Sequence, residues 1–307
     1  TGHDIDVRVS SIPTIYGEKI VMRILDSGSA KYDMDGLGLE PALLKQFKGA
    51  LSQPHGIVIV TGPTGSGKST TLYSALHFLK DPRKNITTVE DPVEYRMKGI
   101  NQIQVKPEIE LDFAKCLRAI LRQDPDIVMI GEIRDKETVE IAIKASLTGH
   151  LVLSTFHTND APSAISRLLS MGIEPFLLAS SLNLVVAQRL VKRICEHCKE
   201  PYPMTAELMK QLKIEPSEAA QMRLYRGKGC GQCDGTGYKG RLPIFEFLPV
   251  NTELREKLTA GASEAQIRAW ARGKGNGGLL ESGVQRMKEG LTTAEEVIGV
   301  TFAEDIM

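Results

Sequence analysis

The sequence is poor in aromatic residues, has no net charge and contains no long apolar run. Aromatic residues make up 5% of the 307 residues, so we expect an aliphatic core. The 38 lysine and arginine residues match the 38 aspartate and glutamate residues in number. A sequence-independent nucleic-acid binder normally carries a basic excess, so the balance argues against nucleic acid as a partner. No apolar segment approaches the roughly 20 residues that a membrane-spanning helix needs, and we expect no transmembrane segment.

Cysteine is also scarce, and the spacing of the cysteines limits the chemical roles that they can have. Four of the five cysteines form two CxxC pairs, which indicates a metal site in a reducing compartment rather than disulfides. No secretory signal is visible. The first residue is Thr1 rather than Met, so we expect a fragment of a longer protein. The length predicts about two domains, and a hydrophobic fraction of 42% is enough for a large core.

The chain begins with a short β-rich segment that has no core of its own. Residues 5–9 and 20–25 are predicted to be strands joined by a turn near Tyr16-Gly17, with Asp6 and Arg8 on one face. We interpret residues 1–26 as the end of an upstream domain. Residues 27–40, with several Gly, Ser and Asp, are expected to be a linker.

From residue 41 a strand, loop and helix pattern repeats. This alternation predicts the α/β class, with a parallel sheet covered on both faces over residues 41–194. Residues 160–192 are predicted to be helical. A cysteine-containing section over 195–240 and a helical region over 241–307, interrupted at Gly273–Gly278, complete the chain. The expected strands are Gly56–Thr61, Asn85–Val89, Asp126–Ile130 and Leu151–Thr155, and the clearest helices are 111–122 and 136–147.

A phosphate-binding loop follows the first apolar strand. The segment 62–69 matches G-x-x-x-x-G-K-[ST], with a strand before it and a helix after it, as the motif requires. Backbone N–H groups and the helix N-terminus would cradle the phosphates of ATP. Lys68 would reach the β- and γ-phosphates, and Ser69 would hold Mg²⁺. The predicted nucleotide contacts here are Gly62, Pro63, Thr64, Gly65, Ser66, Gly67, Lys68, Ser69 and Thr70.

Acidic residues follow two other predicted strands. The buried strand Ile127–Ile130 leads to Glu132, which could hold Mg²⁺ directly or through water. The segment 88–94 carries three carboxylates within five residues, which are costly to hold together without a cation or a shared proton. We expect Glu94 to polarise the attacking water. The alternative for both acids is a solvated acidic turn.

Histidines and arginines near these motifs could contact the phosphates. His150 and His157 flank the strand at 151–156, and we expect one of them to sense the γ-phosphate. A positively charged side chain placed against the γ-phosphate favours phosphoryl transfer, because it stabilises the negative charge that develops there. The alternative for each histidine is a structural role, and for each arginine a surface salt bridge. The candidate arginines are Arg8 and Arg23 upstream, and Arg118, Arg122, Arg134 and Arg167 in the core.

The two cysteine pairs predict one tetrahedral zinc site. The four thiolates of Cys195, Cys198, Cys230 and Cys233 would close its shell, and the long gap between the pairs must contain a small subdomain. A redox dithiol and an Fe–S cluster are the alternatives. His197 is a possible substitute ligand. Cys116, alone on a predicted helix, is expected to be packed.

Together these segments resemble the secretion ATPases of the type II and type IV pilus systems, over essentially the whole chain. The resemblance is carried by 62–70, by the acidic segment 88–94, by 121–134 around Glu132, and by 148–159 around the histidines. It implies a RecA-like ATPase core, preceded by the end of a PAS-like α+β domain. It also implies that Arg8 and Arg23, with the core arginines, serve as catalytic or nucleotide-contacting residues.

The resemblance further implies a homohexameric ring at the cytoplasmic face of the inner membrane, working with a membrane platform protein. Retraction motors of the family lack the four-cysteine insert, so its presence favours an extension or secretion motor. Segments 181–190 and 290–301 look closer to the pilus-assembly branch. Type II secretion is the alternative. A nucleic-acid translocase on the same core and a non-catalytic nucleotide-gated scaffold are further alternatives.

Overall fold

A seven-stranded sheet forms the centre of the molecule, with strand order β11-β8-β3-β7-β6-β4-β5. Six of its strands run parallel, and β11 at one edge runs antiparallel to β8. The computed structural model describes residues 5–26, 33–219 and 222–301, so part of the expected linker (27–32) and the C-terminal residues 302–307 lie outside the described residues. The predicted α/β class with a parallel sheet is confirmed.

The sheet strands are β3 Gly56–Thr61, β4 Ile86–Glu90, β5 Asn101–Gln104, β6 Ile127–Ile130, β7 Leu151–Phe156, β8 Leu182–Ile194 and β11 Tyr238–Pro249. The helices around the sheet are α1 Pro41–Leu51, α2 Lys68–Leu79, α3 Phe113–Ile120, α4 Lys136–Leu147, α5 Ala161–Ser170, α6 Pro175–Ser181, α9 Thr252–Thr259, α10 Glu264–Gly273, α11 Leu279–Lys288 and α12 Ala294–Thr301. The short 3₁₀ helices are η1 Asp35–Leu37, η2 Pro107–Ile109 and η3 Gly231–Cys233.

Both faces of the sheet are buried, as β3 illustrates. Its residues Ile57 and Ile59 belong to one apolar cluster, which also contains residues of α3, α4 and α5. Val58 and Val60 point to the other face, where they belong to a cluster with residues of α1 and α2. Period-two alternation with both faces apolar is what a parallel sheet covered by helices requires.

The prediction of a helical segment over 160–192 was wrong for its last part. Helix α5 ends at Ser170 and α6 at Ser181, and Leu182 begins the long strand β8. The run Leu-Val-Val-Ala at 184–187 is buried completely, and β-branched residues favour a strand buried on both faces. The start of the region 241–307, predicted to be helical, is likewise the strand β11, which pairs with β8.

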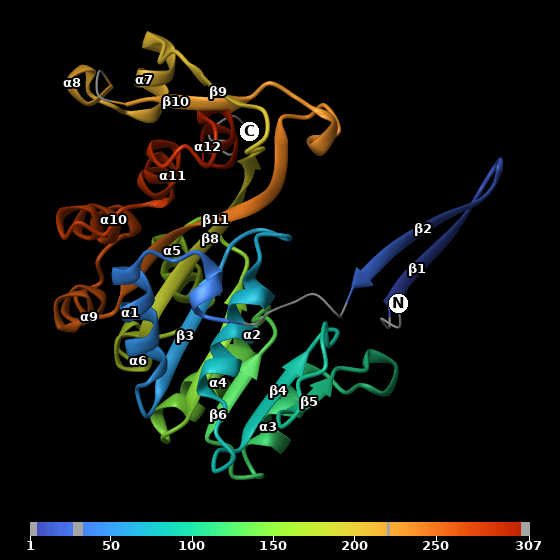
Figure 1. Cartoon of the computed structure of the whole chain (residues 1–307). Helices are drawn as coiled ribbons and strands as arrows, with labels where there is room; N and C mark the ends of the chain where they lie inside the picture. Colours follow the sequence, from blue (N-terminus) through green and yellow to red (C-terminus); the bar gives the residue numbers. More distant parts are fainter. Residues whose placement is uncertain (1–4, 27–32, 220–221, 302–307) are drawn as a thin grey trace.

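The N-terminal residues form the expected hairpin. Strands β1 (Ile5–Thr14) and β2 (Gly17–Asp26) pair antiparallel around a tight turn. In Figure 1 this hairpin projects away from the rest of the chain, beside β4 and β5.

The cysteine-containing section carries β9 (Lys199–Tyr202), α7 (Ala206–Leu212), α8 (Pro216–Ala219) and β10 (Leu224–Gly227). A third apolar cluster joins this section to the last two helices, because Leu212 and Leu224 pack with Met287 and Val297. The section and the C-terminal helices therefore share one small core.

Candidate functional site

Four neighbouring strands of the sheet end at the same edge, and each leads into one of the predicted motifs. The order β3-β7-β6-β4 places the phosphate loop, the His157 segment, Glu132 and the last residues of the acidic segment, 91–94, side by side. Parallel strands have their carboxyl ends on one edge, where open α/β sheets bind ligands. The fold therefore gathers motifs that are up to about 100 residues apart in sequence.

The phosphate loop has the backbone that its glycines predict. Gly62, Gly65 and Gly67 all have positive φ, at 149°, 81° and 91°. A Cβ atom on Gly62 would lie 2.4 Å from the carbonyl oxygen of Gln188 on β8, so a larger residue cannot be accommodated there. Gly67 is the N-cap of α2, whose first residue is Lys68. The loop thus turns its N–H groups and a helix N-terminus toward one point, which suits an anion.

Lys68 is folded back on its own loop. Its Nζ donates to the carbonyl oxygens of Gly62 at 2.7 Å and of Pro63 at 2.9 Å. Burial lowers the pKa of Lys68 to about 8, an effect that Glu132 opposes and Arg189 reinforces. A desolvated ammonium held only by two carbonyl groups would gain strongly from an added anion. Ser69 and Thr70 follow it, exposed at the start of α2.

Glu132 is the centre of a charged cluster. Its side chain is 15% exposed, accepts a hydrogen bond from Arg134, and lies 3.4 Å from Nε2 of His157. Arg134 also approaches Asp91, with Nη1 3.8 Å from Oδ2. The cluster therefore connects the ends of β6, β7 and β4. Glu132 and Ser69 both belong to segments at this edge of the sheet. Their side chains carry oxygen atoms, which are the ligands that Mg²⁺ prefers.

The surroundings of His157 favour the neutral form of its imidazole. Burial lowers the pKa of its imidazole, and the positive charge of Lys68 lowers it further, while Glu132 acts in the opposite direction. A neutral ring can donate one hydrogen bond and accept another. The phosphate-sensing role of His157 stays a prediction.

Glu94 lies on the loop after β4 and contacts the N-terminal hairpin. Its Oε2 accepts a hydrogen bond of 2.7 Å from Nη2 of Arg8. Arg8 and Arg23 are directly opposite each other in the hairpin register, so they project from the same face. The positive charges of Arg8 and Arg23 repel each other in this arrangement. An anion placed between or beside the two side chains would offset that repulsion. The hairpin thus presents a paired cationic face toward the acidic loop.

Arg118 and Arg122 have other partners within this chain, and Arg167 lies at the surface. Arg118 pairs with Glu137 on α4, and Nη1 of Arg122 donates to the carbonyl oxygen of Arg118. Arg167 is exposed in the last turn of α5.

The structure does not bring His150, the other candidate to sense the γ-phosphate, together with His157. His150 precedes β7, and the strands of a parallel sheet all begin at the edge opposite the phosphate loop. Its Nδ1 lies 2.8 Å from the carbonyl oxygen of Ala145, so the imidazole provides a hydrogen-bond partner for a carbonyl group in the last turn of α4.

Three residues beside the site were not predicted from the sequence. Glu90 is buried and hydrogen-bonded to Tyr73, and it belongs to the acidic segment, which was the available signal. Gln188 and Arg189 lie where β8 runs past the end of β3, next to the phosphate loop. No sequence signal could place them there, because their segment was assigned to a helix.

The four paired cysteines converge to a single point. The Sγ atoms all lie within 4.8 Å of one another, with 3.9 Å between Cys195 and Cys230 and 3.8 Å between Cys198 and Cys233. A tetrahedral zinc with Zn–S bonds of about 2.3 Å requires sulfur separations of roughly 3.8 Å. The donor set and the spacing both fit structural zinc.

Backbone N–H groups surround the sulfurs in the way that thiolates require. Gly229 donates to Sγ of Cys198 at 3.3 Å, and Gly237 donates to Sγ of Cys233 at 3.2 Å. These bonds stabilise negative sulfur and orient it toward the shared centre. Cys116 is buried on α3, separate from the four.

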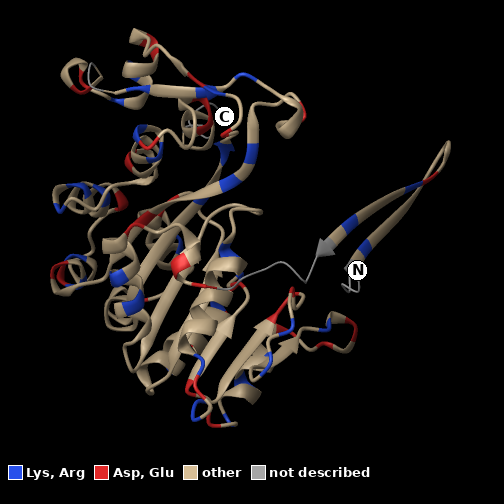
Figure 2. Cartoon of the chain, viewed as in Figure 1, with Lys and Arg blue, Asp and Glu red and all other residues tan. Residues whose placement is uncertain are grey.

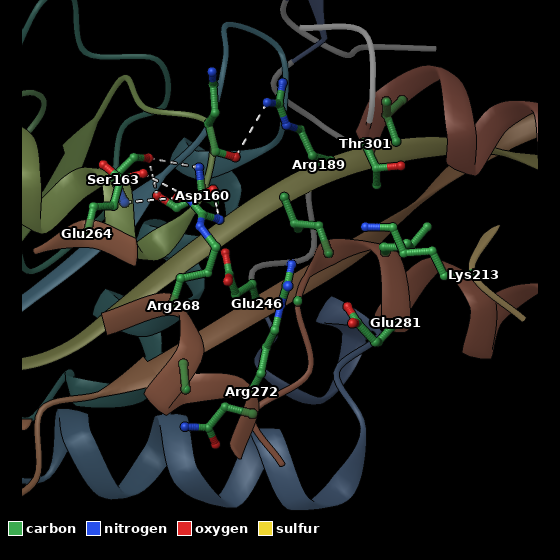
Figure 3. A pocket seen from close by; sticks show the side chains of 17 residues that line it. Asp160, Ser163, Arg189, Lys213, Glu246, Glu264, Arg268, Arg272, Glu281 and Thr301 are labelled. Atoms are coloured by element: carbon green, nitrogen blue, oxygen red, sulfur yellow. Dashed lines mark hydrogen bonds and ion pairs between the residues drawn. The ribbon is translucent and has the colours of Figure 1, made fainter. Parts of the chain in front are cut away.

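A cavity of about 630 Å³ lies between α5, β8, β11 and the C-terminal helices (Figure 3). Asp160, the N-cap of α5, forms an ion pair with Arg268 of α10. The buried carboxylate of Glu246 accepts a 2.9 Å hydrogen bond from the N–H of Ala161. These contacts join the segment that carries His157 to the C-terminal helices.

Figure 2 shows residues of both charge signs interspersed along the described chain. Within the described residues, no helix has both the length and the apolar character needed to cross a bilayer.

The chain matches the family model "Type II/IV secretion system protein" over residues 1–299. It is 51% identical over 299 residues to the type IV pilus assembly ATPase PilB of Thermus thermophilus, a match that covers 97% of this chain and 34% of that protein. It is 50% identical over 300 residues to the type II secretion system protein E of Klebsiella pneumoniae, covering 98% of this chain and 59% of that protein. The chain thus spans about one third to three fifths of the length of these relatives.

A similar fold has been solved for the pilus retraction motor PilT with bound ADP. The TM-score is 0.69 at 25% sequence identity, and the match covers 98% of this chain and 79% of that one.

Proposed function

Because this chain belongs to the type II/IV secretion system protein family, we propose that it binds Mg·ATP at residues 62–70 and hydrolyses it as a motor. The observation that carries the proposal is the convergence of Lys68, Glu132 and His157 at one edge of the sheet. A desolvated lysine on a helix N-terminus, beside a carboxylate and a neutral imidazole, is suited to phosphoryl transfer.

Each residue has a separate task in this proposal. Lys68 would exchange its two carbonyl partners for the β- and γ-phosphate oxygens. Ser69 and Glu132 would hold Mg²⁺, which neutralises phosphate charge when bound. Glu94 would orient the attacking water and accept its proton. His157 would donate a hydrogen bond to a γ-phosphate oxygen, and Arg134 would keep Glu132 in place.

The arginines of the hairpin would complete the site when the hairpin moves against the core. In the present arrangement Arg8 donates a hydrogen bond to Oε2 of Glu94 and holds the carboxylate against the hairpin. Transfer of Arg8 to the γ-phosphate would release Glu94 and add positive charge to the transition state. Arg118, Arg122 and Arg167, exposed on the surface, would serve the site of a neighbouring subunit in a homohexamer.

We further propose that Cys195, Cys198, Cys230 and Cys233 bind one structural Zn²⁺. The motor would act at the cytoplasmic face of the inner membrane, on a platform protein that assembles a type IV pilus. The pilus-assembly relative from Thermus thermophilus supports this choice. Powering type II secretion is the second candidate, favoured by the equally similar Klebsiella pneumoniae protein. Loss of surface pili or of secreted proteins after gene deletion separates the two.

The activity itself is tested by steady-state ATP hydrolysis of the chain and of Lys68→Ala. We expect Mg²⁺-dependent turnover and a loss of at least about 10²-fold in the variant. Its free energy of unfolding should not fall, because removing a desolvated ammonium relieves a cost. Turnover by Lys68→Ala at the parent rate would reject the proposed site.

A further inference from the structure

Tyr73 links the phosphate-binding helix to the loop that carries Glu94. It lies five residues after Lys68 on α2 and is buried, with 1% of its surface exposed. Its Oη accepts hydrogen bonds from the backbone N–H groups of Glu94 at 3.2 Å and Tyr95 at 3.5 Å. The same hydroxyl donates to Oε2 of Glu90. One oxygen atom therefore joins α2, the end of β4 and the acidic loop.

Glu90 is the acceptor at the end of this hydrogen-bond chain. Its carboxylate is buried and also accepts from Oγ1 of Thr88 at 2.6 Å and from Nε2 of Gln102 at 3.1 Å. The backbone N–H groups of Glu94 and Tyr95 can only donate to Oη, so the Tyr73 hydroxyl directs its own proton to Glu90. The lone pairs of Tyr73 are then left to accept from the N–H groups of the loop. Burial, with help from Glu90, raises the pKa of Tyr73 and keeps the proton on the phenol.

The ring of Tyr73 gives this link little freedom. It packs edge-on against Tyr95, with ring centroids 6.0 Å apart, and belongs to the apolar cluster beneath the sheet. A fixed ring on a rigid helix holds the backbone of Glu94 at a set distance from the start of α2. Catalytic groups must be held within a fraction of an ångström, since small misplacements cost large factors in rate.

We propose that Tyr73 is a positioning residue for Glu94, and that it fixes the register between the proposed base and the phosphate-binding end of α2. The inference rests on the proposed function. Tyr73 would not contact the nucleotide. Its effect would appear in the chemical step and not in the binding of ATP.

The competing explanation is that Tyr73 and Glu90 only stabilise the core. Tyr73→Phe keeps the ring and removes the hydroxyl, and it also deprives buried Glu90 of a donor. Thr88→Val is the matched control, because it removes another donor to Glu90 but makes no contact with the Glu94 loop. A purely structural role predicts that both variants lose stability and behave alike in catalysis.

The test is single-turnover ATP hydrolysis, with the steady-state kcat and KM, for the parent, Tyr73→Phe and Thr88→Val. We expect Tyr73→Phe to lower kcat at least about 10-fold with KM within about twofold, and Thr88→Val to keep kcat within about twofold. In a Glu94→Gln background, Tyr73→Phe should add no further loss, because the two changes act through one group. Equal effects on kcat in Tyr73→Phe and Thr88→Val, or a full further loss in the Glu94→Gln background, would overturn the inference.

These outcomes are distinct from failure of the proposed function. A parent chain that does not hydrolyse ATP rejects the function, and the inference with it. A parent that hydrolyses ATP beside a fully active Tyr73→Phe rejects only the positioning role.

Discussion

Arg8 on the N-terminal hairpin donates a 2.7 Å hydrogen bond to the carboxylate of Glu94, 86 residues later in the chain. The two side chains are both about one third exposed, so the contact remains open to competition from another anion. An ion pair at such a site is typically worth under about 1 kcal/mol. A phosphate group can therefore displace Glu94 from Arg8 at little cost.

The first prediction concerns the two hairpin arginines. The double variant Arg8→Ala with Arg23→Ala should bind ATP and assemble, but hydrolyse it poorly, because an arginine on the transferring phosphate is worth roughly 10³–10⁵ in rate. Hydrolysis per chain should rise with protein concentration in the parent as neighbouring subunits complete the site. The measurement is ATPase rate against concentration, with the oligomeric state recorded in parallel.

Lys19→Ala is the matched control, because Lys19 projects from the same face of the hairpin, nearer its turn. It should leave the rate unchanged. If the double arginine variant hydrolyses ATP at the parent rate at every concentration, both arginines make only surface contacts.

The second prediction concerns zinc. Metal analysis should return one zinc per chain, and Cys195→Ser with Cys198→Ser should abolish it. Thiolate zinc sites contribute on the order of 10 kcal/mol to the folding of their own module. Hydrogen exchange should therefore rise across 195–240, and also in α11 and α12, which share the apolar cluster with Leu212 and Leu224. The core should still bind ATP.

Cys116→Ala is the control for loss of a buried thiol, and it should keep the zinc. A native exchange pattern over 195–240 in metal-free protein would refute a structural zinc site.

The third prediction concerns pH and Glu246. Burial raises the pKa of its carboxyl to about 7, with Asp160 contributing in the same direction. A raised pKa means that the folded state favours the protonated form. Its contribution to stability is present below the ordinary glutamate pKa and is lost as pH rises through about 7. Glu246→Gln should therefore gain stability relative to the parent as pH increases.

The gain should be on the order of 1–3 kcal/mol at pH 8 and absent near pH 4. Urea unfolding of both proteins across this range measures it. The half-exposed Glu264, which lines the same cavity, provides a control substitution to Gln that should show no such trend. A stability difference that does not vary with pH would show that folding does not raise the pKa of Glu246.

The sequence motifs were enough to predict which strands end beside one another. They did not predict which side chains pack around those strand ends. Gly62, Glu132 and His157 each follow a predicted strand, and the parallel topology is enough to bring them to one edge. His150 does not join them, because the same rule puts the start of β7 at the opposite edge. Strand β8 was missed because its apolar run continues from two helices without a turn signal. The Tyr73–Glu90 and Asp160–Arg268 contacts arise from tertiary packing, which leaves no local pattern.

The central claim, that this chain hydrolyses ATP with Glu94 as its base, is tested most directly by separating binding from turnover. Nucleotide affinity and single-turnover hydrolysis would be measured for the parent, Glu94→Gln and Glu132→Gln over a series of Mg²⁺ concentrations. We predict that Glu94→Gln binds Mg·ATP as the parent does but loses hydrolysis by at least about 10²-fold, whereas Glu132→Gln also needs more Mg²⁺. Hydrolysis by Glu94→Gln at the parent rate would contradict the account.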